Sequence, residues 1–154
     1  MGNLLFETGH TKQSIGYYET ALKFNSKELY ALIGLGNAVY DLNEPKKAID
    51  YYLQALALDD NLPDVHYNLA NAYFLMGKTT TSIPYYKKAI ELNPEKSESF
   101  YNLGNAYCVL KQYNEAIKAY QSAVYYDNYN GPALYNLGNA YYMKGELEKA
   151  INSY

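Results

Sequence analysis

An asparagine recurs every 34 residues along this chain of 154 residues, and no other feature limits the possible folds as strongly. The series is Asn3, Asn37, Asn71, Asn105 and Asn139, with no insertion or deletion between its members. The surrounding residues recur as well, since residues 100–107 read Phe-Tyr-Asn-Leu-Gly-Asn-Ala-Tyr and near-copies lie at 67–74 and 135–142. A fixed period of this length predicts a stack of helix pairs, in which each pair buries its apolar face against its neighbours.

The spacing inside one period predicts two helices. In the fourth period, large and small apolar residues follow the pattern i, i+3, i+4, i+7, which is one face of a helix: Phe100, Leu103, Gly104 and Tyr107. A second face follows with Ala116, Tyr120 and Ala123. This layout resembles the tetratricopeptide repeat (TPR), in which Leu-Gly and Tyr on one helix precede Ala-x3-aromatic-x2-Ala on the next. The resemblance covers the whole chain and implies an all-α fold, an α-α superhelix (TPR solenoid) of antiparallel helix pairs.

We predict a single TPR array over residues 1–154 and number the positions of each repeat so that Leu103 and Gly104 are positions 7 and 8. The expected repeats are 1–28 (partial), 29–62, 63–96, 97–130 and 131–154 (partial). Because the chain starts and stops inside a repeat, we expect a piece of a longer array, or an array whose ends a partner covers.

Local signals predict how the helices begin and turn. Pro84 follows a run of poor helix formers and is tolerated only in a first turn, so the second helix of the third repeat should begin late, near Thr81 or Ser82. Asn43 stands where the turn glycine is expected, and asparagine tolerates the left-handed conformation.

Other signals concern packing. Gly104 should face Ala116, and Gly138 should face Ala150, at the closest approach of the two helices. The tyrosines of the second helices should be core, as should those at position 11 of the first helices, namely Tyr73, Tyr107 and Tyr141.

The two ends of the chain should expose apolar surface. At one end these residues are Leu4, Leu5 and Phe6, and at the other Ala150 and Tyr154. Exposed patches of this kind favour association, so a homo-oligomer formed by end-to-end stacking is a possible assembly.

Composition excludes several classes of partner. The net charge is −3, and Lys and Glu are mixed along the second helices rather than segregated, so no basic stripe is present to bind nucleic acid. No apolar run approaches the roughly 18 residues of a membrane span. With one cysteine, Cys108, an internal disulfide is impossible, and we expect a reducing, cytoplasmic location.

We expect no catalytic residue, no metal site and no cofactor. His66 stands at a bulky packing position of the first helix and reads as a packed aromatic substitute, and Cys108 reads as a small inert hydrophobe. No Gly-rich phosphate loop, paired-His helix or Cys cluster is present in the sequence.

The TPR resemblance implies that positions 2, 5, 6, 9, 12 and 13 of the first helices line a concave groove that holds a peptide or a helix. The predicted peptide-binding residues are Asn37, Tyr67, Asn68, Asn71, Tyr101, Asn102, Asn105, Tyr135, Asn136 and Asn139. Their pattern resembles the asparagine ladder of the O-GlcNAc transferase TPR array. A side-chain amide can bind a peptide unit through both of its polar groups, but the same asparagines can instead serve solubility and local hydrogen bonding.

The sequence argues against the carboxylate clamp of heat-shock co-chaperones. The clamp positions for Lys and Arg hold Ile33 or Tyr67, then Glu98 or Pro132, and then Asn102 or Asn136. An acidic tail should therefore be repelled, and affinity should depend only weakly on salt.

These patterns together predict a non-catalytic scaffold that binds a protein or peptide partner in its concave groove, with no role for nucleic acid or membrane. Two alternatives stay open, a substrate-recruiting TPR arm of a larger enzyme such as a glycosyltransferase, and a self-assembling structural module.

Overall fold

The structure, a computed structural model, describes residues 1–153, and every regular element in that part is an α-helix. Turns of three or four residues join the helices. The chain divides into two compact units, Met1–Gly77 and Lys78–Tyr154. Each unit is described by itself.

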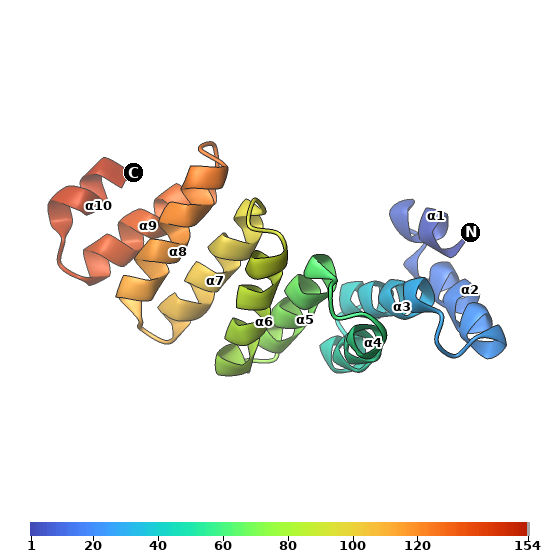
Figure 1. Cartoon of the computed structure of the whole chain (residues 1–154). Helices are drawn as coiled ribbons and strands as arrows, with labels where there is room; N and C mark the ends of the chain where they lie inside the picture. Colours follow the sequence, from blue (N-terminus) through green and yellow to red (C-terminus); the bar gives the residue numbers. More distant parts are fainter. Residues whose placement is uncertain (154) are drawn as a thin grey trace. The chain divides into compact units, whose positions relative to one another are not determined.

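The first unit contains five helices in two layers (Figure 1). Each helix packs against the next, and α1 also contacts α3, as α3 contacts α5, so the odd-numbered helices form one layer. The helices are α1 (Gly2–Glu7), α2 (Thr11–Phe24), α3 (Leu29–Asp41), α4 (Pro45–Leu58) and α5 (Pro63–Leu75).

The second unit repeats this plan, with α7 contacting α9 (Figure 1). Its helices are α6 (Thr79–Leu92), α7 (Ser97–Val109), α8 (Tyr113–Tyr126), α9 (Gly131–Met143) and α10 (Leu147–Ser153). The starts of α4, α6 and α8 are 34 residues apart, as are those of α3, α5, α7 and α9, so the sequence period is the period of the helices.

The core of each unit is built on tyrosines of the even-numbered helices. Tyr52 and Tyr120 are both only 1% exposed. A Cβ atom placed on Gly104 would lie 2.5 Å from the ring of Tyr120, and one on Gly36 would lie 2.4 Å from the ring of Tyr52. The atoms nearest to Gly104 therefore belong to the Tyr120 ring, and the predicted facing of Gly104 and Ala116 stays a prediction. Gly138 is buried, and its partner stays a prediction.

The tyrosines at position 11 are less buried than predicted. Tyr73, Tyr107 and Tyr141 are half-buried, and Tyr107 and Tyr141 pack against the core cluster around Tyr120. The ammonium of Lys149 lies 5.5 Å from the centroid of the Tyr141 ring, a cation–π contact at the surface.

The prediction for Pro84 is wrong. The helix α6 begins at Thr79, at the same position of the repeat as α4 and α8, and Pro84 lies inside it. The turn before α6 and the buried side chains of Thr79 and Ser82 hold the first turn in place, and the Ser82 hydroxyl donates to the carbonyl of Thr79 at 2.8 Å. Tertiary packing here outweighs the loss of one backbone hydrogen bond at proline.

The turn residues and the ends of the chain complete the fold. Asn43 has φ +60°, which confirms the left-handed turn, and Lys111 adopts φ +58° at the equivalent place. At the two ends, Leu4 is 59% exposed, whereas Ala150 is only 2% exposed, so the prediction that Ala150 contributes to an exposed face is wrong. Tyr154 lies outside the described residues.

Candidate functional site

In the first unit, an asparagine of α3 joins three helices. The Oδ1 atom of Asn37 accepts a hydrogen bond of 2.8 Å from the hydroxyl of Tyr52 on α4. The same atom accepts a second bond of 3.0 Å from Nδ2 of Asn68 on α5. Asn37 therefore lies at the meeting point of its own repeat and the next one.

The second unit contains the same arrangement. Oδ1 of Asn105 on α7 accepts a hydrogen bond of 2.7 Å from the hydroxyl of Tyr120 and one of 3.0 Å from Nδ2 of Asn136 on α9. Nδ2 of Asn136 also lies 3.3 Å from the hydroxyl of Tyr101, whose ring is 6.0 Å from that of Tyr120. Two units with different surroundings thus build the same three-way junction.

In the first unit, the junction leaves one amide donor and one amide acceptor without a hydrogen bond. Asn37 uses Oδ1 and Asn68 uses Nδ2, and within the described residues Nδ2 of Asn37 and Oδ1 of Asn68 form no hydrogen bond. Both side chains are half-buried, so water reaches them. One donor and one acceptor, held in place by the other halves of their amides, therefore remain available on the layer of odd-numbered helices.

The tyrosine partners bond to asparagines of the series, whereas our sequence reasoning assigned these tyrosines to the core alone. A signal for them was present, because Tyr18, Tyr52 and Tyr120 each follow an asparagine of the series by 15 residues. In the structure each of these tyrosines donates to that asparagine. The pairing of asparagine and tyrosine therefore follows a spacing of 15 residues that joins two helices. The periodicity within a single helix does not reveal it.

The buried phenols remain neutral donors at ordinary pH. Burial is the main cause that raises the pKa of Tyr52 and of Tyr120 well above the usual range, and the carboxylate of Asp41 adds to the effect at Tyr52. Burial also raises the pKa of the Cys108 thiol, which accepts from the Tyr120 hydroxyl at 3.5 Å. A thiol held in its protonated form is a poor nucleophile, in line with the inert role that the sequence predicts.

Aromatic side chains flank the asparagines. Tyr67 and Tyr101 are half-buried, whereas Tyr135 is 60% exposed and Tyr142 is 61% exposed on α9. Of the other predicted site residues, all lie half-buried on odd-numbered helices and have interactions of their own: Asn71 on α5, Asn102 on α7 and Asn139 on α9.

A recess of about 270 Å³ opens on this layer in the first unit. It lies where Gly34 stands at position 6, the position held by Asn68 and Asn136 in later repeats. The lining residues are Asn3, Phe6, Glu7, Tyr18, Tyr30, Ile33, Gly34 and Asn37.

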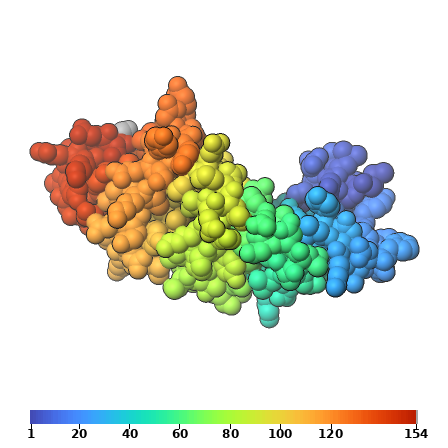
Figure 2. All heavy atoms as spheres, in the orientation of Figure 1, coloured from blue at the N-terminus to red at the C-terminus, as the bar shows by residue number. Residues whose placement is uncertain are grey.

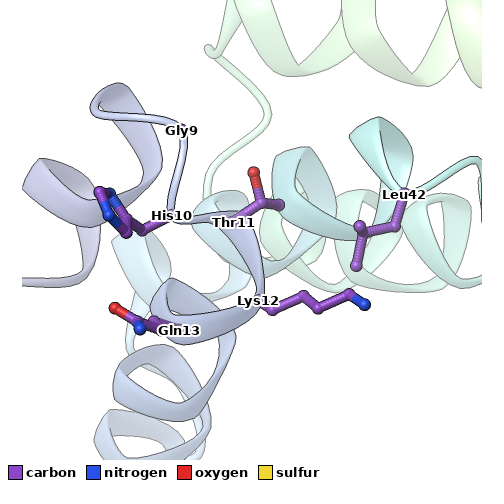
Figure 3. Close-up of a pocket in the computed structure, with 6 residues that line it drawn as sticks. All are labelled: Gly9, His10, Thr11, Lys12, Gln13 and Leu42. Carbon is purple, nitrogen blue, oxygen red and sulfur yellow. The ribbon is translucent and has the colours of Figure 1, made fainter.

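Two further surface features lie away from this layer. A pocket of about 380 Å³ is formed by the end of the turn after α1, the first residues of α2 up to Gln13, and Leu42, and the side chain of Lys12 extends toward Leu42 (Figure 3). The end of α8 and the turn after it stand out from the second unit as an orange projection (Figure 2). Tyr125, near the end of α8, is 82% exposed, and Tyr129, in the turn after it, is 89% exposed.

His66 is a buried residue whose ring bonds to the turn before its own helix. It is 4% exposed, and its Nε2 lies 2.9 Å from the backbone carbonyl of Asp60 and 3.1 Å from the carboxylate of the same residue. The ring therefore joins the turn before α5 to the helix.

Within residues 1–153 no three His, Cys, Asp or Glu side chains gather as metal ligands would, and none of the helices there has the length and apolarity to cross a bilayer.

Comparison with protein families identifies the class. Models described as tetratricopeptide repeat match residues 63–96 and 85–118, and a model described as TPR repeat matches residues 36–77 and 104–145, which is more than half of the chain. The chain belongs to the tetratricopeptide repeat family. Its helix pairs and 34-residue period are those of this family.

Solved structures include several similar chains. A crystal structure of MamA is 25% identical with a TM-score of 0.94, covering 99% of this chain and 90% of that one. A crystal structure of YrrB, described as a TPR protein with an unusual peptide-binding site, is 26% identical with a TM-score of 0.87, covering 99% and 78%. MamA from Desulfovibrio magneticus RS-1, at 19% identity and a TM-score of 0.92, covers 99% and 86% and shares the fold. No curated protein sequence matches the chain.

Proposed function

We propose that this chain is a non-catalytic interaction module that binds an extended peptide segment of a protein partner on its odd-numbered helices. In the first unit the binding residues are Asn37, Tyr67, Asn68 and Asn71. In the second they are Tyr101, Asn102, Asn105, Tyr135, Asn136 and Asn139.

The observation that carries this proposal is the junction made by Asn37, Tyr52 and Asn68 and repeated in the second unit by Asn105, Tyr120 and Asn136. Because the amides are already held by the fold, a peptide that bonds to the remaining donor and acceptor immobilises no further side chain. Avoiding that loss of rotamer freedom favours binding by about 0.5–1.5 kcal/mol for each side chain.

The junction also changes how the asparagines take part. In the first unit both roles that the sequence left open are combined, since one half of the Asn37 and Asn68 amides stabilises the helix stack and the other half is available to the ligand. In the second unit Nδ2 of Asn105 also donates to Oδ1 of Asn102 at 3.5 Å, so there the available acceptor is Oδ1 of Asn136. A peptide unit presents one N–H and one C=O, which match the free acceptor and donor without selecting a side chain.

Exposed tyrosines supply the contact area. Tyr135 and Tyr142 present large, rigid rings that lose little conformational entropy on binding. The similarity to YrrB, whose structure is described with a peptide-binding site, supports the same class of ligand. A cytoplasmic location belongs to this proposal. No observation favours the enzyme-arm alternative, and the self-assembly alternative has in its favour only the exposed apolar residues near the two ends, such as Leu4 and Ile151.

The test is selection of random 12-residue peptides on the immobilised chain, followed by calorimetry with the selected peptides. We expect Tyr135→Ala and Tyr142→Ala to weaken binding about fivefold or more each, because each removes an aromatic contact. The control is Tyr129→Ala, a more exposed ring on the turn after α8, which should leave affinity unchanged.

Two further readings follow from the same experiment. Peptides with a free and an amidated C-terminus should bind alike, and affinity should change little between low and moderate salt. Failure to select any peptide, or loss of binding in the Tyr129 variant alone, would overturn the proposal.

A further inference from the structure

The recess at Gly34 exists because one residue departs from the repeat. In later repeats, the asparagine at position 6 donates its Nδ2 to the asparagine of the preceding repeat, as Asn68 does to Asn37 and Asn136 does to Asn105. Gly34 has no side chain to donate to Asn3. The Oδ1 atom of Asn3 accepts from the hydroxyl of Tyr18 at 2.8 Å and, within the described residues, from no second donor.

With the Tyr18 ring where it lies, this place has no room for a side chain, unlike the same position in later repeats. A Cβ atom on Gly34 would lie 2.4 Å from the ring of Tyr18, which is closer than packed carbon atoms approach. Tyr18 is 6% exposed and forms part of the core with Ala31 and Leu35. The floor of the recess is therefore a buried ring that is held in place, and the recess is not a gap that a small side-chain movement would close.

The chemistry of the walls selects a positively charged donor with an apolar stem. Phe6, Tyr30 and Ile33 supply apolar and aromatic surface, and Oδ1 of Asn3 supplies an unused acceptor. Glu7 is the charged residue of the lining. Its carboxylate is near enough to the Tyr18 phenol to raise the pKa of that group, after the larger effect of burial.

The volume sets the size of the guest. About 270 Å³ is below the roughly 300–1,000 Å³ of pockets that enclose whole small-molecule ligands, so the recess suits one side chain of a larger ligand.

We propose that the recess binds a lysine side chain of the peptide, with its ammonium donating to the Glu7 carboxylate and to Oδ1 of Asn3 and its methylene stem against Phe6 and Tyr30. Lysine supplies three N–H donors on a flexible apolar stem, and aromatic rings attract the cation. This inference rests on the proposed function, since it adds a sequence preference to a surface that otherwise binds backbone. A single exposed ion pair keeps the salt dependence of binding small.

The first test uses a small probe on the isotopically labelled chain. N-acetyl-lysine methylamide is titrated while amide NMR signals are recorded, and the expected result is saturable shifts centred on Asn3, Glu7 and Gly34. The norleucine analogue, which keeps the stem and lacks the ammonium, should bind at least about threefold more weakly. Equal binding of both probes would overturn the proposal and show an apolar recess.

Two variants locate the charge. Glu7→Gln should weaken lysine-probe binding about threefold to fivefold. Asp41→Asn is the matched control, because Asp41 is at the same repeat position beside Tyr52, where Asn68 fills the place that Gly34 leaves open. Equal effects of the two variants would mean that general acidity, and not the recess, attracts the probe.

A gain of binding tests the geometry directly. Asn68→Gly should open a second recess between Asn37 and Asp41, and the lysine probe should then produce a new set of shifts there. This variant is preferable to Gly34→Asn, which would push Tyr18 out of place and confuse loss of binding with loss of packing. A folded Asn68→Gly chain that gives no new shifts would contradict the role assigned to the missing asparagine.

The inference and the proposed function can fail separately. If selected peptides bind but replacing their lysines with glutamine changes nothing, the recess is not a lysine site and the peptide-binding proposal survives. If the lysine probe binds at the recess while no peptide binds the chain, the proposed function fails and the recess stands as a site of its own.

Discussion

At the scale of single residues, the asparagines of the series stabilise the fold through the oxygen of the side-chain amide. The Oδ1 atom of Asn37 accepts two hydrogen bonds from the protein, one of them from a tyrosine that is 1% exposed. A buried hydroxyl that loses its acceptor costs more than a hydrogen bond contributes when it forms. Asn37 therefore stabilises the helix stack, whatever its role in the proposed binding surface.

Asn37→Ala should lower the free energy of unfolding by about 1–3 kcal/mol, because the Tyr52 hydroxyl is left buried without an acceptor. Asn68→Ala removes one bond between half-buried groups and should cost about 0.5–1.5 kcal/mol. Urea unfolding measures both, with Asn61→Ala in an exposed turn as a control near zero. Unchanged stability in Asn37→Ala would show that its amide serves only a ligand.

At the scale of helices, close approach depends on glycines that face tyrosine rings. Gly104→Ala should destabilise the second unit by about 1–3 kcal/mol, since the added methyl would lie 2.5 Å from the Tyr120 ring. Gly16→Ala is the matched control, because that helical glycine has no atom within 4 Å of an added Cβ. There the alanine should stabilise α2 by about 0.5–1 kcal/mol. Thermal unfolding that moves both variants in the same direction would contradict this packing.

Pro84 is a second property of a helix. It lies in the sixth residue of α6, where its ring removes the backbone bond to the carbonyl of Thr80. Pro84→Ala should stabilise the chain by up to about 3 kcal/mol. Pro45→Ala, at the first residue of α4, should change stability little, because no hydrogen bond is lost at that place. Chemical unfolding of the two variants side by side is the measurement, and equal effects would mean that Pro84 does not strain the helix.

At the scale of the whole chain, the buried tyrosines link stability to alkaline pH. Burial raises the folded-state pKa of Tyr52 and Tyr120 above the ordinary phenol value of about 10. A raised pKa means that the folded state favours the neutral phenol. The contribution of these phenols to the free energy of unfolding is therefore fully present below pH 10 and is lost as the pH rises beyond it.

The free energy of unfolding should therefore fall steeply above about pH 10, measured by urea titration from pH 7 to 11. Tyr120→Phe removes one of these phenols and should reduce the slope in that range, at the cost of the bond to Asn105 at neutral pH. A slope unaffected by the substitution would show that other groups control alkaline unfolding.

The linear order of the residues determined the repeating part of this protein. The period of 34 residues predicted the spacing of the helix starts, and the left-handed turn at Asn43 followed from the local conformational preference of asparagine. Such features depend on a few neighbouring residues and on a pattern kept in phase, so they can be read without coordinates.

Only the tertiary structure decided which atoms meet. The late start predicted for α6 at Pro84 failed because packing of Thr79 and Ser82 outweighed local propensity. The contacts of Tyr52 with Asn37, of Tyr120 with Gly104, and of Tyr18 with Gly34 each join two helices. Whether a long side chain reaches across depends on the distance and rotation between those helices, and a one-dimensional pattern contains neither quantity.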